Sequence, residues 1–146
     1  MTLIEILISI TLLAIITGIT ILALNPAKQI AGARNKDRSM HLTVIMNGIR
    51  QNMADNAGGK FTCASGDIPT TTAIMAATGT GTYNIGPCIV PLYMPSMPFD
   101  PNGTTTYYTS PTDYNSGYAV IKNASTGQVT ISAPGAELGQ SIFLTR

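Results

Sequence analysis

The chain opens with a long apolar run and becomes amphipathic only after it. Residues 1–24 are almost wholly hydrophobic, and Glu5 is the only ionisable side chain before Lys28. At about 1.5 Å per residue, a helix over this run spans roughly 36 Å, which is enough to cross a hydrocarbon core of about 30 Å. The pattern therefore predicts a transmembrane helix over residues 1–26, where Pro26 lacks the backbone N–H that a helix interior needs.

Residues 27–57 have the pattern of an amphipathic helix. Apolar or small residues recur at the spacing of one helix face, and most charged residues fall off that face. The stripe predicted to be buried comprises Ile30, Ala33, Met40, Val44, Ile45, Gly48, Ile49 and Met53, and the charged residues expected off it are Arg34, Lys36, Asp37, Arg38 and Arg50. Because Gly58 and Gly59 supply a stop, we predict one helix that continues the apolar run and ends near residue 57.

Residues 58–146 are expected to form a globular head in two parts. Residues 58–103 are rich in Gly, Thr and Pro and predict loops, with at most a short helix near residues 71–77. Residues 104–146 predict three or four antiparallel strands, with a hairpin turn at 123–127; the candidate strands are 104–109, 118–121, 129–133 and 142–144. Such a sheet would bury one face against the 27–57 helix, so the predicted fold class is α+β.

The carboxylate of Glu5 is the feature that a plain membrane anchor leaves unexplained. A charge inside an apolar span is costly in lipid and by default marks function. A secretory signal peptide would show basic residues before the apolar run and a small-residue cleavage site after it, and neither pattern is found. We therefore expect the segment to be retained.

The first ten residues, MTLIEILISI, resemble the mature N-terminus of type IV pilins and pseudopilins, and NPAKQIA at residues 25–31 extends the resemblance. It implies a subunit of a pilus, or fimbrium, whose apolar helices pack in the filament centre while the heads form its outer wall. The carboxylate of Glu5 would form an ion pair with the α-amino group of Met1 in a neighbouring copy. A peptidase would remove a leader and methylate the new N-terminus, and the assembly machinery would move the subunit from the inner membrane into an extracellular filament. Such filaments serve cell adhesion, twitching motility or DNA uptake.

The segment between Gly18 and Pro26 is a weak stretch of helix. Glycine costs about 1 kcal/mol and proline about 3 kcal/mol in a helix interior, and β-branched residues lie between them. One interpretation is an ordinary proline kink, which membrane helices tolerate. The other, which the resemblance implies, is a segment that is helical in the bilayer and stretched in the filament.

Two other functions remain open from the sequence. One is a pseudopilin of a type II secretion system, which would share the anchor and Glu5 but form a short periplasmic fibre. The other is a membrane-anchored adhesion module that acts singly. A polymer on the cell surface would favour the pilus, and a periplasmic location would favour the pseudopilin. A detergent-stable monomer would favour the anchored module.

Composition narrows the chemistry further. Only 10% of residues are charged and the net charge is +1, which argues against nucleic-acid binding through a basic face. Cys63 and Cys88 are an even pair in a chain that looks exported, so we expect a disulfide, with free buried thiols as the alternative. His41 is the only histidine, and no metal-ligand spacing accompanies it. Asp100 is expected to cap a turn rather than bind Ca²⁺ together with Asp113.

The sequence contains no recognisable set of catalytic residues. The sequence offers no Cys/His pair, no paired carboxylates and no phosphate-binding loop. We therefore predict a protein that is not an enzyme and uses no cofactor or metal.

Overall fold

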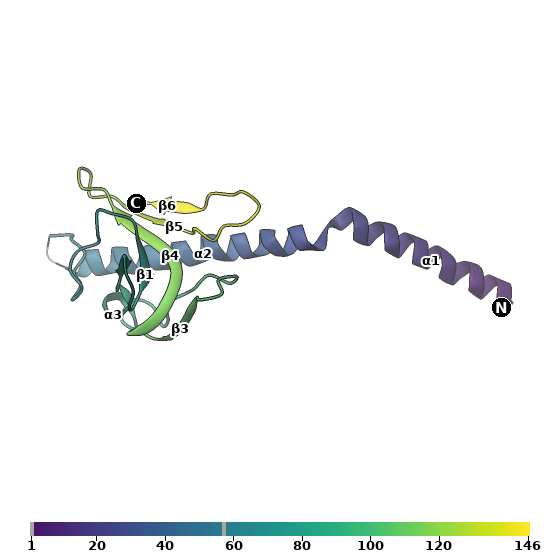
Figure 1. The fold of residues 1–146 in the computed structure, drawn as a ribbon, viewed down its shortest axis with the longest axis horizontal. Helices are drawn as coiled ribbons and strands as arrows, with labels where there is room; N and C mark the ends of the chain where they lie inside the picture. Colours follow the sequence, from purple (N-terminus) through teal and green to yellow (C-terminus); the bar gives the residue numbers. More distant parts are fainter. Residues whose placement is uncertain (1, 57) are drawn as a thin grey trace.

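The computed structural model describes residues 2–56 and 58–146. Its N-terminal part is two consecutive helices, α1 (Leu3–Leu24) and α2 (Pro26–Asp55), and α1 extends away from the head (Figure 1). The single continuous helix predicted from the sequence is thus interrupted at Asn25, whose left-handed backbone (φ 41°) separates the two. Ending α1 at Leu24 places Pro26 at the first position of α2, where its missing N–H and fixed φ cost nothing.

The head is a sheet wrapped around the C-terminal half of α2, with a short helix, α3 (Gly86–Ile89), beside it. In the described residues the sheet has six strands in the order β2-β1-β4-β5-β6, with β3 also paired to β4. The strands are β1 (Ala73–Ala76), β2 (Thr82–Tyr83), β3 (Tyr107–Ser110), β4 (Asp113–Lys122), β5 (Val129–Ser132) and β6 (Phe143–Thr145). This layout is compatible with the predicted α+β class.

Two details of the sheet differ from the prediction. Residues 71–77, predicted to be loop with at most a short helix, instead contain the strand Ala73–Ala76, which pairs with β4. The sheet is also larger than predicted and not wholly antiparallel, since β1 and β2 run parallel. For β1 the deciding partner is β4, which is distant in sequence, so the local pattern does not contain it.

The hairpin predicted around residues 123–127 is confirmed. β4 and β5 pair antiparallel with Lys122 opposite Val129, and the loop between them is exposed. Along β5, Val129 and Ile131 are buried while Thr130 and Ser132 are partly exposed, which is the alternation expected of a strand with one face on the core.

The face of α2 that packs on the head differs from the predicted stripe. Of the predicted residues, Ile45, Gly48 and Ile49 are buried and Met53 is partly buried, whereas the other four are exposed. The buried face instead comprises Ala31, Asn35, Arg38, Leu42, Ile45, Met46, Gly48, Ile49 and Asn52. The prediction that Arg38 lies off the buried face is therefore wrong.

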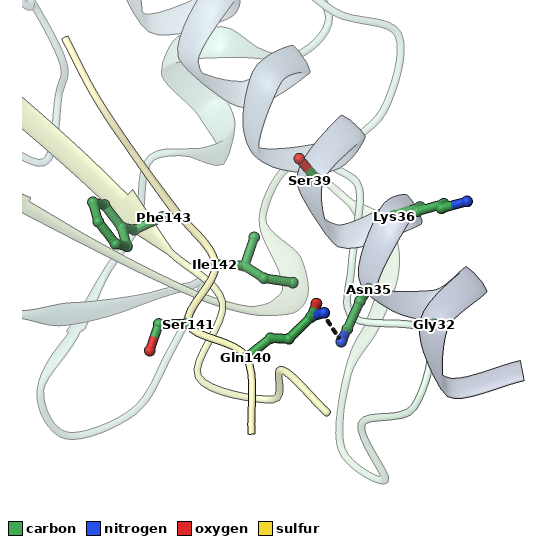
Figure 2. Close-up of a pocket in the computed structure, with 8 residues that line it drawn as sticks. All are labelled: Gly32, Asn35, Lys36, Ser39, Gln140, Ser141, Ile142 and Phe143. Carbon is green, nitrogen blue, oxygen red and sulfur yellow. Dashed lines mark hydrogen bonds between the residues drawn. The ribbon is translucent and has the colours of Figure 1, made fainter. Parts of the chain in front are cut away.

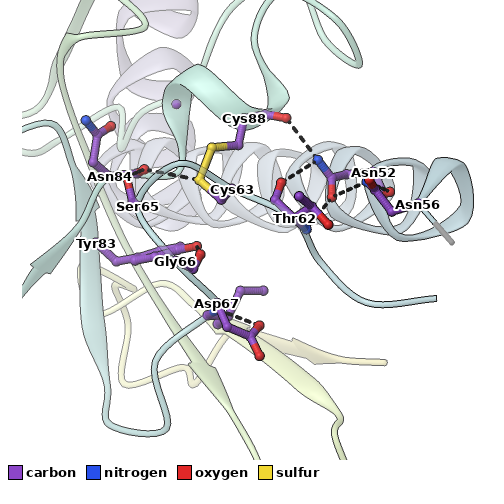
Figure 3. The surroundings of a disulfide bond; sticks show 12 residues. Asn52, Asn56, Thr62, Cys63, Ser65, Gly66, Asp67, Tyr83, Asn84 and Cys88 are labelled. Atoms are coloured by element: carbon purple, nitrogen blue, oxygen red, sulfur yellow. Dashed lines mark hydrogen bonds between the residues drawn. A yellow bond between two sulfur atoms is a disulfide. The ribbon is translucent and has the colours of Figure 1, made fainter. Parts of the chain in front are cut away.

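A disulfide pins the loop-rich half of the head to α3. Cys63 and Cys88 are bonded, with their Cα atoms 5.2 Å apart. Beside the bond, Asn52 of α2 donates to the carbonyl oxygens of Thr62 and Cys88 and accepts from the Thr62 N–H (Figure 3). One helix side chain thus satisfies the backbone on both sides of the cross-link.

We expect the disulfide to be a main source of order in residues 58–103. On the chain-entropy model, a loop with a sequence separation of 25 gives roughly 3–4 kcal/mol. The Cys63→Ser/Cys88→Ser double variant should therefore unfold at lower denaturant concentration by about that free energy. Non-reducing mass analysis of the wild type should yield one cross-linked peptide, and two alkylatable thiols in the native protein would contradict the assignment.

Candidate functional site

Helix α1 presents its apolar surface to the surroundings. Residues 2–21 are all exposed, and the Leu3–Ile21 span, with a mean hydropathy of 2.4, has no part buried against the rest of the chain. By length and composition α1 is able to span a membrane. Apolar surface of this extent in one continuous helix requires lipid or another apolar surface to cover it.

The hydroxyl groups on α1 are satisfied within the helix itself. Ser9, Thr11, Thr17 and Thr20 each donate to a backbone carbonyl one turn earlier, at distances between 2.7 and 3.0 Å. In an apolar medium such local bonds remove the need for an outside partner. The carboxylate of Glu5 is therefore the polar group of α1 that still calls for an explanation.

Glu5 lies in the first turn of α1, where its Oε2 atom accepts a hydrogen bond from the Thr2 backbone N–H at 3.3 Å. An acidic residue at this position satisfies one of the free N–H groups and faces the positive end of the helix dipole. This contact gives Glu5 a local, neutral partner. The predicted ionic partner, the α-amino group of Met1, lies outside the described residues.

The two residues predicted to weaken the helix have different positions. Gly18 is inside α1, and a Cβ added there would meet no atom within 4 Å. Pro26 begins α2 directly after the break at Asn25. In the single chain the interruption is therefore confined to one residue, and stretching of the whole 18–26 segment stays a prediction for the assembled state.

We expect that residues 18–26 lose their helical hydrogen bonds in a filament. Gly18 costs about 1 kcal/mol against alanine inside α1, and the β-branched residues that follow it add a rotamer cost. The helix is already interrupted at Asn25, directly before Pro26, so the segment is the weakest part of the two helices. A filament map should show extended backbone there, and the Gly18→Ala/Pro26→Ala variant should show helix instead. Continuous helix from Ile10 to Ile30 in wild-type filaments would contradict the expectation.

A second cluster of polar residues lies where α2 enters the head. Arg38, with 0% of its surface exposed, donates from Nε and Nη2 to the two carboxylate oxygens of Asp100 at 2.8 and 2.9 Å. Its Nη1 atom donates to Glu137 at 2.9 Å and to Asn35 at 2.8 Å. Arg34 also donates to Glu137. We call these five residues the clamp, because they join α2 to two distant loops of the head.

The ionisation of the clamp follows from these contacts. Burial raises the pKa of Asp100, but the hydrogen bonds from Arg38 and from the Asn102 N–H lower it by more than burial raises it, so the net shift is downward. Hydrogen bonds from Arg34 and Arg38 lower the pKa of Glu137 to about 2. Both carboxylates are therefore charged at neutral pH. Asp100 does cap a turn as expected, but its main partner is an arginine that sequence reasoning assigned to the surface.

His41 lies next to the clamp and is partly buried. Its Nδ1 atom is 2.8 Å from the hydroxyl oxygen of buried Tyr118, and the two rings meet edge to face. Burial lowers the pKa of His41, so the ring is neutral at physiological pH. Its role in this geometry is to satisfy the Tyr118 hydroxyl.

The surface pocket between α2 and the head has few ionisable residues in its lining. This pocket of about 450 Å³ lies between α2 and the segment that leads into β6, where Asn35 donates to Gln140 at 3.0 Å (Figure 2). Lys36 is the only ionisable residue among those that line it. Among the described residues, no group of three or more His, Cys, Asp or Glu side chains is placed to hold a metal ion.

Comparison with known proteins found no family model, no curated protein and no solved structure that matches this chain.

Proposed function

We propose that this protein is a structural subunit of a type IV pilus-like filament, which polymerises through α1. The observation that carries the proposal is the exposure of residues 2–21, an apolar helical surface that the chain's own head leaves wholly uncovered. Before assembly lipid would cover this surface, and in the filament the α1 helices of other copies would do so.

The clamp supports a mechanical role. A subunit held by α1 and loaded through its head transmits force across the place where α2 enters the head. There Arg38 joins α2 to Asp100 and Glu137 by charge-assisted hydrogen bonds, which are stronger than neutral ones. The disulfide fixes the other half of the head. Both features suit a head that must stay folded while its helix is pulled.

Glu5 gives the proposal its specificity. A singly acting anchor can use the carboxylate only to cap its first turn, whereas a polymer can also use it to set how neighbouring helices align. We infer that the α-amino group of Met1 in an adjacent copy is its partner. The same arrangement would serve a short periplasmic fibre, so the place of assembly distinguishes the pilus from a pseudopilin.

The test is to shear filaments from cells that produce the protein, to image them by electron microscopy and to identify the subunit by mass spectrometry. The proposal expects helical fibres on the cell surface with this chain as the principal component. Short fibres confined to the periplasm would favour the pseudopilin. A detergent-extracted monomer from cells without fibres would favour an anchored module and contradict the proposal.

A further inference from the structure

The chain contains two Asn-Gly dipeptides, at 47–48 and 102–103, in very different surroundings. Asparagine amides are thermolabile. The reaction that removes them begins when the backbone nitrogen of the next residue attacks the side-chain carbonyl carbon. Glycine in the next position leaves that nitrogen unhindered, because it has no Cβ. Whether the attack occurs then depends on how firmly the backbone is held.

Asn102 is exposed in a turn that follows buried Asp100. Its carboxamide makes no hydrogen bond to any residue that the structure describes. The N–H of Gly103, which would have to be released, donates only a long hydrogen bond of 3.4 Å to the Asp100 carbonyl oxygen. Both reacting groups are therefore open to solvent and weakly held.

The turn also requires its glycine. A Cβ on Gly103 would lie 2.4 Å from Thr106 Cγ2, closer than any real contact. The Thr106 hydroxyl donates to the carbonyl oxygens of Asp100 and Gly103, which brings it against the turn. The fold thus keeps the reactive dipeptide, since a larger residue at 103 would displace Thr106.

Asn47 provides a comparison within the same molecule. It is exposed like Asn102, but it lies in the middle of α2. The N–H of Gly48 is committed to a carbonyl one turn earlier, as in any α-helix. Gly48 is buried, and a Cβ there would meet Met94 at 2.7 Å. Attack at Asn47 therefore requires local opening of a packed helix.

We propose that Asn102 and Gly103 form a self-modification site, at which the chain converts its own asparagine amide to a carboxylate. The Gly103 nitrogen loses its proton and bonds to Cγ of Asn102, the Cγ–Nδ2 bond breaks, and ammonia leaves. A water molecule then opens the cyclic imide at either carbonyl, which gives aspartate or isoaspartate at position 102. Water is the only co-reactant.

The product changes the head in a defined place. The formal net charge of the chain falls by one from +1, a large relative change for a protein with 10% charged residues. The new carboxylate lies two residues from Asp100, whose Oδ1 atom accepts both the Asn102 N–H and Arg38 Nη2 at 2.9 Å. The isoaspartate product also lengthens the backbone of the turn. Modification therefore marks older molecules with a charge beside the clamp.

The test uses the purified full chain, incubated folded at pH 7.4 and 37 °C, with peptides analysed by mass spectrometry at intervals. We expect aspartate and isoaspartate to accumulate at position 102 about a hundredfold faster than at 47, which corresponds to an opening free energy of about 3 kcal/mol for α2 at about 1.4 kcal/mol per tenfold. In urea, where neither site is held, the two rates should become similar. Isoelectric focusing should show an acidic band that grows with time.

The Asn102→Ser variant is the matched control, because the Asn102 side chain has no bonding partner to lose among the described residues. It should fold like the wild type and show no acidic band. Equal native rates at positions 47 and 102, or an unchanged position 102 while position 47 reacts, would overturn the proposal. So would a position 102 that reacts in urea but not in the folded protein.

Discussion

Replacing Arg38 by methionine is expected to lower the free energy of unfolding of the head by about 3–5 kcal/mol, the usual cost of removing one partner of a buried ion pair. Methionine fills much of the volume of the arginine side chain, so the loss measures the missing charge and hydrogen bonds more than a cavity. What remains is Asp100, a carboxylate with 4% of its surface exposed, whose one remaining donor among the described residues is the Asn102 N–H.

The measurement is denaturant unfolding of the full chain in detergent, followed by the near-ultraviolet circular dichroism of the buried tyrosines Tyr114 and Tyr118. Arg34→Met is the matched control. It removes an arginine whose side chain is 30% exposed and whose ion pair, among the described residues, is with Glu137, so we expect a much smaller loss than for Arg38→Met. Similar losses for the two variants would show that burial of the Arg38 pair does not matter.

At acidic pH the difference in the free energy of unfolding between wild type and Arg38→Met should become smaller. In the wild type the folded pKa values of Asp100 and Glu137 lie below their unfolded values. The stability that each contributes is present above its unfolded pKa of about 4 and is lost as the pH falls through its lowered folded pKa, which for Glu137 is about 2. In the variant, protonation of the unpaired Asp100 relieves a buried charge, so its stability relative to wild type should rise over the same range. The Arg38→Met/Asp100→Asn double variant should recover part of the loss at neutral pH.

The contrast between Arg38 and the β4–β5 hairpin shows what the sequence was able to predict. The hairpin depends on neighbours in sequence: a polar turn between two segments of alternating residues. Arg38 depends on Asp100 and Glu137, which lie 62 and 99 residues away. A charged residue next to other charges is normally assigned to the solvent face, and no pattern within α2 reveals partners at that distance.

The same limit explains the exposed part of the predicted stripe. Ile30, Met40 and Val44 have helical spacing and apolar side chains, which is all that the periodicity tests. They remain 55%, 58% and 46% exposed because the head covers another face of α2. Periodicity identified the helix correctly but could not say which side the sheet would occupy. The choice of Glu5 as a candidate site did not need the tertiary structure, because a lone carboxylate in an apolar run is unusual in any fold.

Replacing Glu5 by leucine is expected to leave membrane insertion intact and to abolish efficient entry into filaments. A carboxylate at the centre of an apolar span costs on the order of 2.5–3.5 kcal/mol on insertion scales and less near its end, so the variant should insert at least as well as wild type. The next cationic side chain along the chain is Lys28, roughly 35 Å away along a helix, so the partner we propose for Glu5 is the α-amino group of Met1 in another copy. Pairing between copies neutralises two charges only when the helices dock in register. Loss of one partner of such a pair typically costs 3–5 kcal/mol.

Glu5→Gln separates this role from helix capping, because Glu5 also accepts the Thr2 N–H at 3.3 Å. Glutamine keeps a carbonyl oxygen for that hydrogen bond but carries no charge. If ionic pairing between copies selects the register, Glu5→Gln should be excluded from filaments as strongly as Glu5→Leu. If capping is the main role, Glu5→Gln should enter like the wild type while Glu5→Leu fails. Tagged wild-type and variant subunits, produced together and counted in sheared fibres, give the ratio directly. Equal incorporation of wild type and both variants would mean that Glu5 has no part in assembly.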